Sequence, residues 1–230
     1  MTHLIMIPGM MCDARLFAPQ IDAFRSQYEV EVASISSHTR IDELAANVLE
    51  RAPHKFALAG LSMGGIVAME ICAQAPDRVV KLALMDTNPM KESDEIKQWR
   101  KLQIQEVMDG KLQKVVRDDL KPKYLANTPN KQAILDICMK MALSLGPNVF
   151  LRQSIALRDR PDQQETLQSL DIPTLILCGA EDRLCSPDKH KLMHDLITNS
   201  RLEVIMNAGH MPTLEQPEKT TEALRLWLTR

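Results

Sequence analysis

Apolar residues in the first ninety positions follow two alternating patterns, short continuous runs and longer runs at helical spacing. Short apolar runs that end at glycine, proline or polar residues are typical of buried strands, and apolar residues three and four positions apart are typical of helices. The pattern predicts strands at residues 3–7, 29–34, 55–59 and 79–85, and helices at residues 41–51 and 66–75. Strands that alternate with helices predict a parallel sheet covered on both faces, which is an α/β, doubly wound architecture.

Residues 91–159 break this alternation, because they contain no strand pattern. Their apolar residues form stripes at helical spacing, including one over residues 112–120 and another over residues 134–145 that Gly146 and Pro147 end. Strand patterns return at residues 173–177 and 202–206, with helical patterns at residues 187–196 and 215–228. Since the sheet needs strands from both sides of the interruption, we predict a core of residues 1–90 and 171–230 and an inserted helical cap of residues 91–170.

Composition and charge narrow the classes of partner. The 230 residues are 45% hydrophobic and 25% charged, with a net charge of −2, so no basic field would attract nucleic acid or an anionic membrane. The histidines and the five cysteines lack metal-site spacing, and the odd cysteine count favours a reducing compartment. No apolar run is long enough for a signal segment or a membrane span. We therefore expect a soluble cytoplasmic protein with a small-molecule substrate and neither metal nor other cofactor, of undetermined oligomeric state.

Ser62 lies at the point where the pattern changes from strand to helix. It stands in Gly60-Leu61-Ser62-Met63-Gly64, a G-x-S-x-G sequence that follows the strand at 55–59 and precedes the helix at 66–75. A serine on so sharp a turn projects as a nucleophile, and glycines two positions before and after it leave room for the turn. The alternative interpretation is an ordinary strand-to-helix turn with a buried serine, so a base and an orienting acid are also required.

His210 and Asp182 follow the two last predicted strands, where catalytic groups of a doubly wound sheet gather. His210 comes directly after Gly209 and suits a general base, and Asp182 suits the acceptor that fixes the histidine tautomer. Glu181 is adjacent to Asp182 but should point elsewhere. Asp86 also ends a strand and is an alternative orienting acid, although a capping role explains it as well.

Two backbone N–H groups near Ser62 are needed to stabilise negative charge on a carbonyl oxygen. One is predicted at Met63, the residue after the nucleophile. The other is predicted in the loop after the first strand at Met10, where Gly9 allows close approach of the backbone, and Met11 is an alternative donor.

The serine motif, Asp182 and His210, in the chain order Ser…Asp…His, resemble the α/β-hydrolase fold family. The resemblance covers residues 3–90 and 171–229, and it covers the cap by position only. It implies a serine hydrolase with Ser62, Asp182 and His210 as the catalytic triad and the amides of Met10 and Met63 as the oxyanion hole. Many relatives carry His-Gly in the oxyanion loop, whereas this chain has Pro8-Gly9.

The expected function is a carboxylesterase that acts on a small or medium ester, since methionines surround the predicted site and the charge is near neutral. Carbon–carbon bond hydrolysis, thioester hydrolysis and a lyase step remain alternatives on the same triad. A non-enzymatic ligand sensor on the same scaffold is an alternative of another class. Arg152, Arg158 and Arg160 near the end of the cap either bind a substrate carboxylate or belong to a solvated helix face.

Overall fold

A six-stranded sheet forms the centre of the computed structural model, which describes residues 2–229. The strand order is β2-β1-β3-β4-β5-β6, and each neighbouring pair is parallel. Every residue of β3 and β5 is buried, because helices cover both faces of these central strands. The strands are β1 (Thr2–Ile7), β2 (Tyr28–Val32), β3 (Phe56–Leu61), β4 (Val79–Met85), β5 (Thr174–Gly179) and β6 (Ser200–Ile205). The predicted doubly wound parallel sheet is therefore confirmed.

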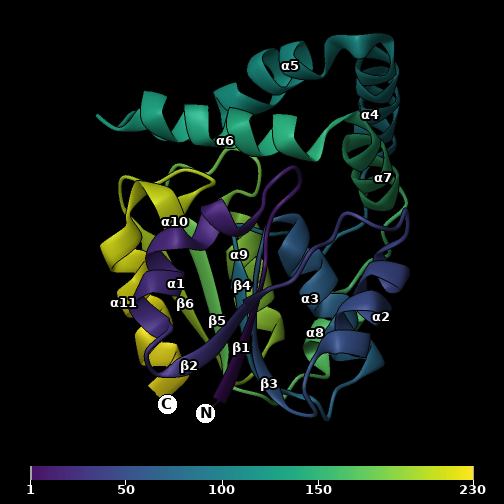
Figure 1. Ribbon diagram of the computed structural model, residues 1–230. Coiled ribbons are helices and arrows are strands. Elements are labelled where there is room, and N and C mark those ends of the chain that lie inside the picture. The colour runs from purple at the N-terminus through teal and green to yellow at the C-terminus, as the bar shows by residue number, and fades with distance from the viewer. Residues whose placement is uncertain (1, 230) are drawn as a thin grey trace.

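Each face of the sheet has its own apolar core. One face is covered by α2 (Ile41–Arg51), α3 (Met63–Gln74), α8 (Gln164–Gln168) and α9 (Pro187–Leu196). The other is covered by α1 (Ala18–Phe24), α10 (Pro212–Glu215) and α11 (Pro217–Thr229), together with η1 (Ala14–Phe17). Figure 1 shows these two helical layers on either side of the strands. Buried Met63, Ile66 and Val67 belong to the first core, so packing of α3 fixes the turn that precedes it.

Apart from α8, the helices between β4 and β5 lie above the carboxyl ends of the strands (Figure 1). They bury a third apolar cluster that includes Val115, Phe150 and Met11, the last from the loop after β1. The segment comprises α4 (Asp94–Glu106), η2 (Val107–Lys111), α5 (Leu112–Val115), η3 (Val116–Leu120), η4 (Lys121–Lys123), α6 (Lys131–Leu145) and α7 (Pro147–Arg158). The predicted helix end is confirmed, since α6 stops at Leu145 and Gly146 takes a φ of 79° before Pro147.

The helix that follows this segment, α8, packs against α3 and α9 of the sheet layer. The division into a core of residues 1–90 and 171–230 and a cap of residues 91–170 stays a prediction, and these contacts favour a cap that ends before α8. Within residues 2–229, the only helices that together have the length and apolar character of a membrane span are α6 and α7, and they meet at a bend of 98°.

Candidate active site

Ser62 stands between the end of β3 and the start of α3 in a strained backbone conformation, with φ 56° and ψ −117°. Its N–H donates to the carbonyl oxygen of Met85 at 2.9 Å, and its own carbonyl oxygen accepts a hydrogen bond from Thr87 Oγ1 at 2.7 Å. These bonds to β4 and to the residues after it hold the strained turn in place. The sequence motif therefore forms the sharp strand-to-helix turn that was predicted.

The two glycines of the motif leave space that a side chain would fill. A Cβ atom on Gly60 would lie 2.3 Å from the carbonyl oxygen of Gly64. A Cβ atom on Gly64 would lie 2.0 Å from the carbonyl oxygen of Ile7, at the end of β1. Gly64 is thus required mainly because α3 closely approaches the end of β1, rather than for the turn itself.

Ser62, His210 and Asp182 form one hydrogen-bonded series. The Ser62 hydroxyl lies 2.9 Å from His210 Nε2, and His210 Nδ1 lies 2.8 Å from Asp182 Oδ2. Both His210 and Asp182 are almost fully buried, whereas Ser62 is half-buried. Glu181 is exposed and takes no part in this series. The structure thus brings together three residues that are 120 and 28 positions apart in the chain.

Asp182 is held as an acceptor from two directions. Its second carboxylate oxygen, Oδ1, accepts hydrogen bonds from the N–H groups of Leu184 at 2.8 Å and Cys185 at 3.0 Å. Burial acts to raise the pKa of Asp182, but interaction with His210 and these backbone bonds outweigh it and lower the pKa below its usual value. An ionised Asp182 fixes the proton of the neutral His210 ring on Nδ1 and leaves Nε2 free to accept the Ser62 proton.

Asp86, the alternative orienting acid, forms no hydrogen bond with His210 in the part of the chain that the structure describes. It is fully buried at a φ of 44°, and its Oδ1 accepts a hydrogen bond from the N–H of Gly179 at 2.9 Å. Burial, together with the charge of Asp182, raises the pKa of Asp86 well above its usual value. The environment therefore favours the protonated form of Asp86 and the ionised form of Asp182.

Replacement of Asp86 with asparagine is expected to stabilise the protein increasingly as the pH rises from 4 to 8. Above the unfolded-state pKa, the unfolded chain loses the Asp86 proton more readily than the native state does, so the contribution of Asp86 to wild-type stability falls as the pH rises through this window. Asparagine keeps the acceptor for Gly179 and tolerates the positive φ. The gain at pH 8 relative to pH 4 should be about 1 kcal/mol or more, measured by urea unfolding at both pH values. A gain that is the same at both would contradict a neutral Asp86.

Two residues that the sequence analysis did not single out support His210. Glu215 in α10 accepts the N–H groups of Gly209 at 2.9 Å and Met211 at 3.1 Å through Oε2, and its Oε1 accepts that of Ala126 at 2.8 Å. The buried carboxylate thus ties the His210 loop to the segment after η4. An acidic residue in the first turn of a helix is a general signal of a helix start, and Glu215 offered that signal in the sequence.

Tyr124 supports His210 from above. The Tyr124 carbonyl oxygen accepts the N–H of His210 at 2.6 Å, and the two rings stack with their centroids 6.2 Å apart. Tyr124 lies between η4 and α6, in the predicted cap segment. Its position beside His210 had no signal in the sequence, since 86 residues separate the two.

The predicted amide donors are available at Met10 and Met63. Neither N–H group donates a hydrogen bond within residues 2–229, and both residues line the same cavity as Ser62. Met63 begins α3, so its N–H is one of the unsatisfied groups at the helix start. The alternative donor, Met11, has its N–H bound to Gln153 Oε1 at 2.8 Å. The structure therefore favours Met10 over Met11.

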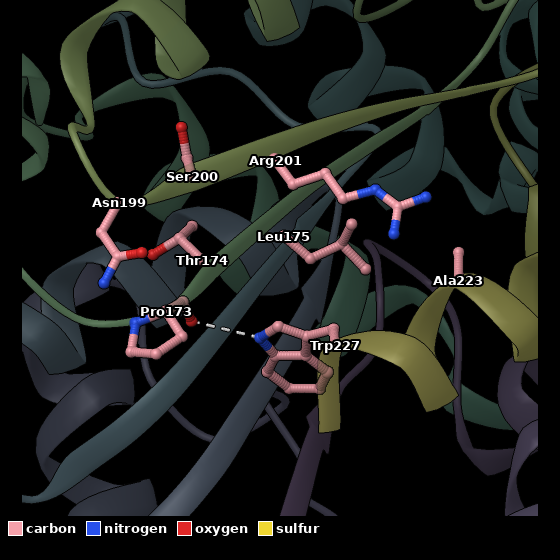
Figure 2. Close-up of a pocket in the computed structure, with 8 residues that line it drawn as sticks. All are labelled: Pro173, Thr174, Leu175, Asn199, Ser200, Arg201, Ala223 and Trp227. Carbon is pink, nitrogen blue, oxygen red and sulfur yellow. Dashed lines mark hydrogen bonds between the residues drawn. The ribbon is translucent and has the colours of Figure 1, made fainter. Parts of the chain in front are cut away.

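The Ser62 hydroxyl and the His210 ring open on a cavity of about 620 Å³. Its lining combines the carboxyl-end loops of the sheet with residues of α4, η3, η4 and α7, including Ile96, Trp99, Leu120 and Leu157. A smaller hollow of about 220 Å³ is lined by residues that include Pro173, Thr174, Ser200 and Trp227. Figure 2 shows these residues, with the indole N–H of Trp227 donating to the carbonyl oxygen of Pro173. That hollow lies at Thr174 and Ser200, the first residues of β5 and β6, and therefore at the opposite edge of the sheet from Ser62.

Asp182, His210 and Cys185 bring candidate metal-binding atoms within 4.8 Å of one another. The bond between Asp182 and His210 and the bond between His210 and Ser62 already use the carboxylate and both ring nitrogens. Burial raises the pKa of the Cys185 thiol, which disfavours the thiolate that a metal would need. These residues fit a hydrogen-bonded triad better than a metal site.

The three arginines near the end of the predicted cap have different surroundings. Arg152 donates to the carbonyl oxygen of Ser36, and Arg158 pairs with its neighbour Asp159. Arg160 alone of the three lines the cavity, where it pairs with Glu92 at 2.6 Å.

Comparisons with known proteins agree with this geometry. Residues 29–217 match the serine aminopeptidase, S33, family. The pimeloyl-[acyl-carrier protein] methyl ester esterase of Aliivibrio salmonicida is 25% identical, over 99% of this chain and 92% of its own length. A putative 2-succinyl-6-hydroxy-2,4-cyclohexadiene-1-carboxylate synthase of Bacillus subtilis is 23% identical, over 84% of this chain and 73% of its own.

Among solved structures, a malate-bound thermophilic esterase of Thermogutta terrifontis superposes with a TM-score of 0.90 at 27% identity, over all of this chain and 90% of its own. The matched segment of the family contains the strand-to-helix turn of Ser62, Asp182 and His210. The sheet, the serine turn and these matches lead to one conclusion: the chain belongs to the serine aminopeptidase S33 family of α/β-fold hydrolases.

Proposed function

We propose that this protein is a carboxylesterase that cleaves small to medium carboxylic esters through an acyl-enzyme. The observation that carries the proposal is the series from Ser62 through His210 to Asp182, which opens on a cavity of about 620 Å³. The relatives that are named as esterases support ester cleavage. The apolar side chains of Ile96, Trp99, Leu120 and Leu157 in the cavity lining suit an apolar acyl or alcohol group.

The reaction begins when Ser62 Oγ attacks the ester carbonyl carbon while His210 Nε2 takes the hydroxyl proton. Asp182 holds the ring and stabilises the imidazolium that forms. The N–H groups of Met10 and Met63 stabilise the negative charge on the carbonyl oxygen. His210 then donates its proton to the departing alcohol oxygen, and a water molecule, deprotonated by His210, attacks the acyl-enzyme and releases the acid.

A lyase is a second candidate, because the chain is 23% identical to the putative Bacillus subtilis synthase. There Ser62 and His210 would act together as a base that removes a proton from the substrate, and no acyl-enzyme would form. Trapping of a covalent Ser62 adduct, detected as a mass increase after rapid mixing with an activated ester, distinguishes the two.

An activity screen tests the proposed function directly. The protein is assayed with p-nitrophenyl esters of two to ten acyl carbons, an acyl thioester, a vinylogous diketone and an amino-acid p-nitroanilide. We expect multiple turnover with an optimum among the esters, because the cavity holds a medium-sized acyl group. The anilide should have a kcat/KM at least about tenfold lower, because its amide carbonyl is less reactive and its amine is a poorer leaving group than p-nitrophenolate. Release of one equivalent of product without further turnover would instead indicate a sensor. A preference for the diketone or the thioester would indicate a carbon–carbon bond hydrolase or a thioesterase.

The partner that we propose is the small ester itself, and the compartment is the cytoplasm. The free thiols of Cys12, Cys72 and Cys178 support a reducing compartment, since buried thiols of this kind are typical of intracellular proteins.

A further inference from the structure

Three charged side chains, Glu92, Arg100 and Arg160, form a buried group at one end of the cavity that Ser62 opens on. Glu92 lies just before α4, Arg100 lies on α4, and Arg160 lies just after α7. Their side chains are only 3%, 11% and 8% exposed, respectively. This group, the Arg-Glu-Arg cluster, is not needed for the chemistry described above.

One carboxylate serves two guanidinium groups in the cluster. Glu92 Oε1 accepts from Nη2 of Arg100 and from Nη1 of Arg160, and Glu92 Oε2 accepts from Arg100 Nε at 3.0 Å. Two other carboxylates line the cavity, Glu95 and Asp119, but neither forms an ion pair among residues 2–229. The cluster therefore keeps one positive charge that no residue neutralises, and a buried charge of this kind is costly unless something pairs with it.

Each arginine also keeps a donor without a strong acceptor. Arg100 Nη1 contacts only the thioether of Met10, a weak acceptor, at 3.8 Å. Arg160 Nη2 makes no hydrogen bond within residues 2–229 and is not fully sealed from solvent. Burial lowers the pKa of Arg160, as expected for a charge that lacks full compensation.

The contact with Met10 fixes where these donors lie. Met10 carries one of the two amides that we propose for the oxyanion hole, so the Arg100 guanidinium reaches the side chain of a residue whose backbone borders the reacting carbonyl. Five cationic side chains but only three carboxylates line the cavity, although the whole chain carries a net charge of −2. The excess of positive charge is therefore concentrated in the cavity.

We propose that the Arg-Glu-Arg cluster is a carboxylate-binding subsite, and that the natural substrate is an ester that carries a second, anionic carboxylate. The inference rests on the proposed esterase function. A substrate carboxylate would accept from Arg100 Nη1 and Arg160 Nη2, neutralise the remaining charge, and hold the ester carbonyl beside Ser62. Guanidinium groups bind carboxylates through such paired hydrogen bonds.

Binding is tested in a Ser62→Ala background, which removes turnover, with two matched series of probes. These are the monomethyl and dimethyl esters of straight-chain dicarboxylic acids from succinate to suberate, titrated by calorimetry. We expect at least one monomethyl ester to bind about tenfold more tightly than its dimethyl counterpart, because only the former presents a carboxylate. Equal affinity for both series at every length would overturn the proposal, whether or not the wild-type protein hydrolyses esters.

Arg160→Gln and Arg100→Gln separate recognition from folding. Either change leaves Glu92 with one arginine, a balanced pair, so the fold should persist. Each should weaken binding of the monomethyl ester by about 10- to 100-fold, and binding of the dimethyl ester by less than about threefold. Arg158→Gln is the matched control, since Arg158 lies on α7, pairs with Asp159 and does not line the cavity. Equal weakening for both esters would mean that the cluster only holds the cap.

Glu92→Gln should not weaken binding of the monomethyl ester, in contrast to the two arginine substitutions. It removes the competing carboxylate, so a variant that keeps its thermal unfolding transition should bind the monomethyl ester at least as tightly as the parent protein. A cluster with a purely structural role would instead lose affinity for both esters in this variant. Wild-type kinetics with the same probes test the proposed function separately. Failure to hydrolyse any ester would contradict the esterase function, whereas the binding measurements alone decide whether the cluster is a carboxylate-binding subsite.

Discussion

Replacement of Ser62 with alanine is expected to lower kcat for ester hydrolysis by about 10⁴-fold or more, with little change in stability. The substitution removes only the Oγ atom that lies 2.9 Å from His210 Nε2. Alanine and serine meet the same strain at a φ of 56°, and the backbone bonds to Met85 and Thr87 do not involve the lost hydroxyl. Initial rates with the best ester of the screen measure the effect. Ser144→Ala, an exposed serine on α6 outside the cavity lining, is the control.

The hydrogen-bonded series from Ser62 to Asp182 also predicts that the losses of kcat in Ser62→Ala and His210→Ala do not add when the two substitutions are combined. Once Ser62 is absent, His210 has no hydroxyl to deprotonate, so the variant that lacks both side chains should be about as slow as either single variant. Asp182→Asn should also cost about 10⁴-fold in kcat, because an amide favours the wrong tautomer of His210. Additive losses in the double variant, or wild-type rates in Ser62→Ala, would contradict the acyl-enzyme mechanism.

The parts of the fold that the sequence predicts well are those where local pattern and tertiary position agree. The strands β3 and β5 are continuous apolar runs that are buried on both faces, so their pattern and their environment carry the same information. The site residues were predictable for a similar reason. Ser62 directly follows β3, and Asp182 and His210 lie in the loops that follow β5 and β6. The carboxyl ends of parallel strands meet at one edge of a sheet. Their position after strands of one parallel sheet thus places Asp182 and His210 near Ser62.

Features that depend on contacts between distant segments were not predictable. The choice between Met10 and Met11 as amide donor depends on Gln153, which lies 142 positions from Met11 and occupies its N–H. The stripe predicted over residues 112–120 is interrupted by wide helical turns, and Gly110 with its φ of 85° kinks the chain just before it. Helical spacing cannot show where a turn widens, because the same apolar residues fit both geometries.

The Arg-Glu-Arg cluster illustrates the limit most clearly. In the sequence, Arg160 is one of three arginines at the end of a helical stretch, a pattern that is typical of a solvated face. Its neighbours in space are Glu92 and Arg100, 68 and 60 positions earlier, and the three come together where the chain leaves the sheet and returns to it. Burial and the shared carboxylate, rather than the residue types, distinguish Arg160 from Arg152 and Arg158.

Replacement of Gly64 with alanine is expected to destabilise the protein by about 3 kcal/mol or more, a large share of the stability of an ordinary domain. The added Cβ would lie 2.0 Å from the carbonyl oxygen of Ile7 and 2.7 Å from that of Pro8. Both neighbours are backbone atoms, at the end of β1 and in the loop that follows it, so no side chain can rotate away. Urea unfolding measures the change, with Gly9→Ala as the control because its Cβ would meet nothing closer than 3.4 Å.

Relief of this clash would also move the site. Helix α3 and the end of β1 must separate, and the two proposed amide donors lie on opposite sides of that contact, Met63 at the start of α3 and Met10 in the loop after β1. Folded Gly64→Ala protein should therefore lose kcat by about 10²-fold or more, comparable to removal of one oxyanion donor, while Ser62 and His210 remain present. A variant with wild-type stability and wild-type kcat would show that β1 and α3 can shift apart without disturbing the two amides, and the oxyanion hole would then have to be sought elsewhere in the loop.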